Sequence, residues 1–131
     1  MKKIILILLC LLSLFACSSK VKKYEGEYSD TYSMRANMTC SAIGDKLYIE
    51  ITWSSSAEET TQWQMSATLK DNYLVYNDCI KTVISMKDGM AKSIVEYDNV
   101  SGSFTVKDDI LYWTGAKELE NARCVFEKVK K

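Results

Sequence analysis

The chain has 131 residues, in which 17 Lys and Arg balance 17 Asp and Glu, and it contains no His and no Pro. That length suits one small domain, and the balanced charge argues against a nucleic-acid-binding protein, which needs a basic face. Without histidine the chain cannot form a Ser-His-Asp triad, a Cys-His dyad or an imidazole metal site.

The N-terminal residues have the three parts of a secretory signal peptide. Lys2 and Lys3 provide positive charge, residues 4–12 form a nearly unbroken apolar run, and residues 13–17 (Ser-Leu-Phe-Ala-Cys) give a small-residue cleavage context. The Leu-Phe-Ala-Cys run resembles the lipobox of bacterial lipoproteins. This resemblance implies that residues 1–16 are removed and that the thiol of Cys17 carries lipid, which would make the chain a membrane-anchored lipoprotein. The alternative is an ordinary signal peptide whose cysteine is incidental.

On this interpretation residues 17–23 are a short, basic, lipidated tether, and residues 24–131 form the folded domain. No other segment is apolar over the length that a membrane-spanning helix needs. We therefore expect a cell-envelope protein held on the membrane by its lipid. In a host with two membranes, Ser18 favours the outer one by analogy with other lipoproteins.

The rest of the chain alternates between apolar and polar residues with a period of two. Residues 34–42, 47–53 and 63–69 show this alternation most clearly, which is typical of half-buried antiparallel strands. Asp88-Gly89 is a strong hairpin signal. Further strands are expected at 73–77, 80–86, 90–97, 103–106, 110–114 and 122–129, with a turn at 99–102 and single helical turns at 55–59 and 116–121.

Short connections between successive strands favour an all-β fold, an antiparallel up-and-down barrel of about eight strands. A barrel of that size either fills its lumen with side chains or holds one small ligand. The apolar residues expected to point inward are large, which favours a packed core over a lipocalin-like cavity. They are Met34, Met38, Leu47, Ile49, Ile51, Trp53, Trp63, Met65, Leu69, Ile84, Phe104 and Trp113.

Three cysteines remain after Cys17: Cys40, Cys79 and Cys124. In a closed meander an early strand lies beside the last one, so a Cys40–Cys124 disulfide would join the two ends of the sheet. The alternative is that all three cysteines are reduced core residues.

No arrangement of residues predicts an enzyme, a metal site or a cofactor. The adjacent carboxylates Asp108-Asp109 and Glu58-Glu59 lie in expected turns, whereas glycoside hydrolysis needs two carboxyl groups that face each other across a cleft. Exposed tyrosines are the remaining binding signal, although β-sheets favour tyrosine in any case. The candidates are Tyr24, Tyr28, Tyr32, Tyr48, Tyr73 and Tyr112.

Residues 100–104 (Val-Ser-Gly-Ser-Phe) and 111–115 (Leu-Tyr-Trp-Thr-Gly) resemble the family of membrane-bound inhibitors of C-type lysozyme. The resemblance implies an eight-stranded barrel on a lipid anchor, a disulfide between an early strand and the C-terminal one, and a Ser-Gly loop that enters the lysozyme cleft. Ser101 and Gly102 would be the inserting pair, and Lys117 would stand for the family's lysine.

The sequence thus predicts a lipid-anchored, non-enzymatic envelope protein whose barrel presents loops 54–61, 98–103 and 115–121 to a partner. Inhibition of a lysozyme-type glycosidase is the first alternative. Carriage of a small hydrophobic ligand is the second.

Overall fold

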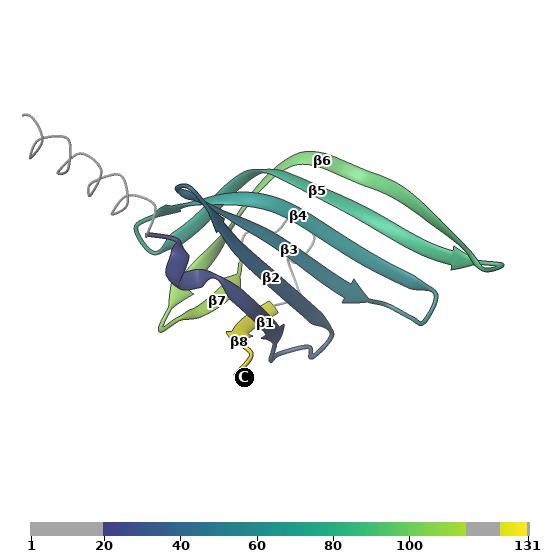
Figure 1. The fold of residues 1–131 in the computed structure, drawn as a ribbon, viewed down its shortest axis with the longest axis horizontal. Coiled ribbons are helices and arrows are strands. Elements are labelled where there is room, and N and C mark those ends of the chain that lie inside the picture. Colours follow the sequence, from purple (N-terminus) through teal and green to yellow (C-terminus); the bar gives the residue numbers. More distant parts are fainter. Residues whose placement is uncertain (1–19, 115–123, 131) are drawn as a thin grey trace, which may run out of the picture.

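The fold is a closed barrel of eight antiparallel strands in chain order (Figure 1). The computed structural model describes residues 20–114 and 124–130. Each strand pairs with the next in the sequence, and β1 pairs with β8 to close the ring. The predicted all-β up-and-down barrel is therefore confirmed. Its elements are the 3-10 turn η1 (Lys22–Tyr24), β1 (Gly26–Asp30), β2 (Ala36–Ile43), β3 (Lys46–Ser54), β4 (Glu59–Lys70), β5 (Tyr73–Lys87), β6 (Met90–Lys107), β7 (Ile110–Trp113) and β8 (Cys124–Lys128).

In β2, β3 and β4 the apolar residues of the alternating pattern point into the barrel, as predicted. Met38, Ile51 and Trp63 lie opposite one another across these three strands, and all three are buried. The residues between them along each strand point outward. Two positions expected to point inward do not: Met34 is 85% exposed, with a φ of 61° in the β1–β2 loop, and Ile84 lies on the outer face of β5.

β5 and β6 are longer than the sequence predicts, because the residues expected to form turns within them form β-bulges and the strands continue. The β4–β5 register shifts between Gln64 and Ala67. There the carboxylate of Asp78 accepts hydrogen bonds from the amide of Ser66, at 3.0 and 3.3 Å, in place of the missing backbone partner. In β6, Asn99 has a φ of 54° within the strand. A bulge of this kind bends a strand without ending it.

The β3–β4 connection is not helical. The Ser56 hydroxyl accepts hydrogen bonds from the amides of Glu58 and Glu59, as in a helix cap, but the next residues enter β4. The helical turn expected at 116–121 lies outside the described residues.

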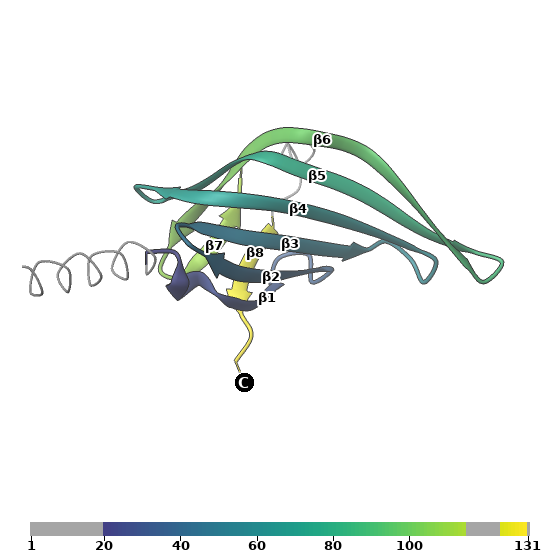
Figure 2. The ribbon, with the colours of Figure 1, turned by 45° about the horizontal axis from the view of Figure 1, so that its top comes forward.

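The wall of the barrel is uneven in height (Figure 2). β1, β7 and β8 have 5, 4 and 5 residues, whereas β4, β5 and β6 have 12, 15 and 18. The long strands continue past the short ones at one end. The first described residues, including η1, lie at the opposite end (Figure 1).

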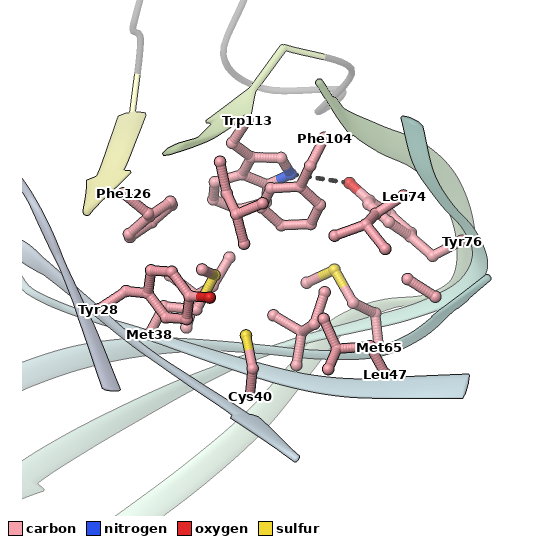
Figure 3. Close-up of a cluster of buried hydrophobic side chains, with 14 of the residues drawn as sticks. Tyr28, Met38, Cys40, Leu47, Met65, Leu74, Tyr76, Phe104, Trp113 and Phe126 are labelled. Atoms are coloured by element: carbon pink, nitrogen blue, oxygen red, sulfur yellow. Dashed lines mark hydrogen bonds between the residues drawn. The ribbon is translucent and has the colours of Figure 1, made fainter. Parts of the chain in front are cut away.

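The lumen holds a packed cluster of aromatic and aliphatic side chains (Figure 3). Phe104 is fully buried, and its ring centroid lies 5.8 Å from that of Trp113, 5.9 Å from that of Tyr76 and 6.5 Å from that of Phe126. Trp113 donates a hydrogen bond of 2.9 Å from Nε1 to the hydroxyl of Tyr76. These contacts join β5, β6, β7 and β8, so protein side chains occupy the centre of the barrel, as the size of the inward residues suggested.

At the end where the described chain begins, η1 folds against the core. Val21 and Tyr24 are buried, and the hydroxyl of Tyr28 donates a hydrogen bond of 2.7 Å to the carbonyl of Tyr24. Burial raises the pKa of Tyr28, so the phenol stays protonated as that bond requires. Two of the tyrosines expected on the surface, Tyr24 and Tyr28, therefore serve the core instead.

Candidate interaction surface at the open end of the barrel

Residues 80–97 form an arm that projects beyond the barrel (Figures 1 and 2). The arm consists of the last part of β5 and the first part of β6, paired from Lys87 opposite Met90 to Lys81 opposite Tyr97. Asp88 and Gly89 connect them, both with positive φ, 54° and 74°. The hairpin predicted at this turn is therefore present.

One edge of the arm faces no strand of the described chain. β7 pairs with β6 only from Phe104 to Lys107, at the other end of β6. The stretch from Met90 to Glu96 pairs with β5 on one side, and within residues 20–114 and 124–130 no strand pairs with it on the other. Natural proteins usually protect such an edge, because its backbone groups can pair with another chain.

Apolar side chains line both faces of the arm. Met90 is 74% exposed, Ile94 52% and Val95 59%. Because side chains alternate along a strand, the neighbours Ile94 and Val95 point to opposite faces. The sequence signal that could have indicated this arm is the pair of adjacent apolar residues in each strand, Val83-Ile84 and Ile94-Val95. Adjacent apolar residues place apolar side chains on both faces of a strand rather than on one buried face.

At the base of the arm a lysine is held among aromatic rings. Nζ of Lys81 lies 5.7 Å from the ring centroid of Trp63 and 5.8 Å from that of Tyr97, and it forms an ion pair of 2.8 Å with Oε2 of Glu96. Nε1 of Trp63 donates a hydrogen bond of 3.1 Å to the hydroxyl of Tyr97. The Trp63 ring meets Trp113 of the core edge to face at 5.4 Å. This chain of contacts ties the arm to the barrel.

The seam between β1 and β8 is held by a buried carboxylate that the sequence did not single out. Asp30 Oδ1 accepts hydrogen bonds from the amides of Tyr32, at 3.0 Å, and Val125, at 2.9 Å. Oδ2 accepts from the amide of Ser33, at 3.1 Å, and from the Ser33 hydroxyl. Burial by itself would raise the pKa of Asp30, but these donors outweigh it and lower the pKa below its ordinary value.

The expected Cys40–Cys124 disulfide is not formed in the structure: Cys40 and Cys124 are free, buried thiols, and Cys79 is buried as well. β1 lies between β2 and β8, with Cys40 opposite Gly26, whereas Phe126, two residues from Cys124, lies opposite Asp30. The four residue steps from Gly26 to Asp30 alone span about 13 Å along the strand. A disulfide needs Cα atoms within about 7 Å.

The thiols of Cys40 and Cys124 lie in different environments. Burial raises the pKa of Cys40 to about 12. Burial and the neighbouring Asp30 carboxylate, which accepts a hydrogen bond from the thiol, raise the pKa of Cys124 to about 12. Both are therefore poor nucleophiles at neutral pH.

Ser101 and Gly102 do not form a loop. Both lie within β6, where Gly102 pairs with Tyr76 of β5, and Ser101 is exposed. The prediction of a loop at 98–103 is therefore wrong, because β6 continues through these residues with β-bulges in its pairing with β5. Cys17 and Lys117 lie outside the described residues.

The remaining candidates are on the surface. Asp108 and Asp109 form the β6–β7 turn, and Glu58 and Glu59 lie at the β3–β4 turn, all exposed to solvent. Tyr32, Tyr48 and Tyr73 are exposed at separate places, and Tyr112 is half-buried.

Within the described ranges, no group of three or more His, Cys, Asp or Glu residues is placed to hold a metal ion. Nor does any helix among the residues described have the length and apolarity to cross a membrane. Comparison with models of known families, with curated proteins and with solved structures finds no match.

Proposed function

We propose that the protein is a lipid-anchored, non-enzymatic binding protein of the cell envelope, which contacts a partner protein through the arm at residues 80–97. The observation that carries this proposal is the open edge of β6 from Met90 to Glu96. An exposed edge strand binds an extended segment of another chain by adding a strand to the sheet, with backbone hydrogen bonds providing affinity and side chains providing selectivity.

The composition of the arm supports this role over that of a passive hairpin. Covering Ile94 and Val95, each more than half exposed, would contribute on the order of 1 kcal/mol apiece from apolar burial. Isolated two-stranded hairpins are marginally stable, but the first part of β4 pairs with the arm from Glu59 to Trp63 and stiffens its base. A stiff edge loses little conformational freedom when it binds.

The position of the arm suits an anchored protein. The first described residues, which include η1, lie at the end of the barrel opposite the arm (Figure 1). Lipid on Cys17 would therefore hold the molecule by one end and leave the β6 edge uncovered. The anchor itself is tested by Cys17→Ser, which should abolish incorporation of labelled fatty acid and release the chain into the soluble fraction; unchanged labelling would overturn the anchor at Cys17.

The arm is tested with a photoactivatable residue in place of Ile94 in the full chain, expressed in its host. The matched control carries the same residue in place of Tyr48, an outward-facing side chain of β3 that is 50% exposed. Covalent protein adducts should form at position 94 and not at position 48. Equal adduct patterns at the two positions, or none at position 94, would show that the arm is not a binding surface.

A second candidate, inhibition of a C-type lysozyme, has support from the eight-stranded barrel that the resemblance implies. Because Ser101 and Gly102 lie in a paired strand, an inhibitor would have to use another part of the surface. The purified chain added in molar excess to a C-type lysozyme should then slow the lysis of cell walls, and lysis at the full rate would exclude this candidate.

A further inference from the structure

We infer that the partner of the arm is a second copy of the same chain, and that the two arms pair antiparallel along β6 about a two-fold axis at Ile94. This inference rests on the proposed function and names the partner of the same surface. Most soluble oligomers are symmetric, and a two-fold interface requires that one patch be complementary to itself. The β6 edge meets that requirement.

The charges on the edge are complementary under this symmetry. With Ile94 opposite its own copy, Lys92 of each chain lies opposite Glu96 of the other, since each is two residues from the axis. Opposite charges directly across an antiparallel pair stabilise it, and like charges destabilise it. A parallel, in-register pairing would instead place Lys92 opposite Lys92 and Glu96 opposite Glu96.

The contact of Glu96 with Lys81 prepares the edge for this pairing. Lys81 is held over the rings of Trp63 and Tyr97 and contacts Oε2 of Glu96 at 2.8 Å, while the Glu96 side chain remains 45% exposed. The carboxylate is thus fixed at the edge of the sheet with Oε1 available for a second cation. Lys92 is exposed and forms no ion pair with another described residue.

The apolar residues fit the same register. Ile94 meets Ile94 of the copy on one face, and Val95 lies opposite Ser93 on the other, so side chains that are exposed in one chain pack across the axis. The pairing joins β4, β5 and β6 of both copies into one continuous sheet. With the axis along the membrane normal, the barrels lie at the two outer ends and both tethers reach one membrane.

Cysteine trapping tests the register. Full-length protein carrying Ile94→Cys is oxidised, with Ser41→Cys, an exposed position on β2, as the control. The wild type provides the background, because the thiols of its domain are buried. A disulfide-linked dimer should form at position 94 and not at position 41. Equal trapping at both positions would overturn the inference.

Charge reversal in the Ile94→Cys background tests the complementarity. Lys92→Glu alone, or Glu96→Lys alone, places like charges opposite each other twice and should lower the trapped dimer about tenfold. Mixing these two variants restores both opposite-charge pairs, so heterodimers should form at the original level. Absence of heterodimers would refute pairing about Ile94, as would dimers of each variant alone at the original level. If the photoactivatable residue at position 94 captures only proteins of other masses, self-pairing fails while the proposed binding function stands.

Discussion

The substitution Asp30→Asn should destabilise the barrel at neutral pH and have a much smaller effect in acid. The carboxylate accepts hydrogen bonds from three backbone amides and a hydroxyl, and it is buried at the seam between β1 and β8. An amide at this position keeps one acceptor oxygen but turns its NH2 group toward the amide of Ser33. One buried N–H then has no acceptor, and the other bonds lose the strength that a negative charge gives them. The expected loss in the free energy of unfolding is about 2–4 kcal/mol.

The pH dependence follows from the lowered pKa of Asp30. A carboxyl group whose pKa is lower in the folded state than in the unfolded state stabilises the fold above the unfolded value, and it loses that contribution as the pH falls through the folded value. The unfolded value is about 3.9. The wild type should therefore lose its advantage over Asp30→Asn below about pH 4.

Urea unfolding followed by tryptophan fluorescence measures both effects, because Trp63 and Trp113 are buried. The control is Asp71→Asn in the exposed β4–β5 turn, where φ is 53° and asparagine fits as well as aspartate. Its effect should stay within about 0.5 kcal/mol. If Asp30→Asn matches the control at pH 7, or if its effect is the same at pH 7 and in acid, the hydrogen bonds to Asp30 do not hold the seam.

Three further predictions concern the core and the thiols. Phe104→Ala, at the centre of the aromatic cluster, should cost about 3–5 kcal/mol in the same unfolding assay, and far more than Tyr73→Ala on the surface; equal losses would contradict the packing in the lumen. Trp63→Phe removes the bond to the Tyr97 hydroxyl and should cost about 1 kcal/mol, while Tyr97→Phe should add little to it; additive losses would show that the bond is absent. Cys40 and Cys124 should react with a thiol reagent only after unfolding, and a peptide map of the unreduced protein should contain no Cys40–Cys124 pair; finding that pair would show that the strand register is wrong.

The alternation of side chains was enough to predict the class of fold and much of the core. It placed Met38, Ile49 and Met65 on the inner face, because hiding such side chains at every second position requires a curved sheet with one dry face. It did not find β1, whose buried positions include the carboxylate of Asp30. In the sequence this aspartate looks like a surface residue, because the backbone amides that donate to it come from other parts of the chain as well as from its own loop.

The candidate site was harder to predict, because a pattern of residues does not specify register. Asp78 and Asn99 are typical turn residues, but neither ends its strand. Asp78 accepts a hydrogen bond from Ser66 at the β4–β5 bulge, and Asn99 has a positive φ within β6, so both strands continue beyond the barrel. Once β6 is continuous, Ser101 and Gly102 are strand residues rather than a loop. The same continuity creates the arm, which could not be predicted while 90–97 and 103–106 were separate strands.

The closure of the ring affects how the chain can fold during synthesis. Val125 and Asp30, which meet at the junction, are 95 residues apart in the sequence. Local hairpins such as β2–β3 and β5–β6 can form as soon as both strands have left the ribosome. The pairing of β8 with β1 cannot form until nearly the whole chain has been synthesised. Until β8 is added, β1 and β7 each have an unpaired edge that is accessible to chaperones and proteases. A chain truncated before residue 124 should therefore be degraded rather than accumulate.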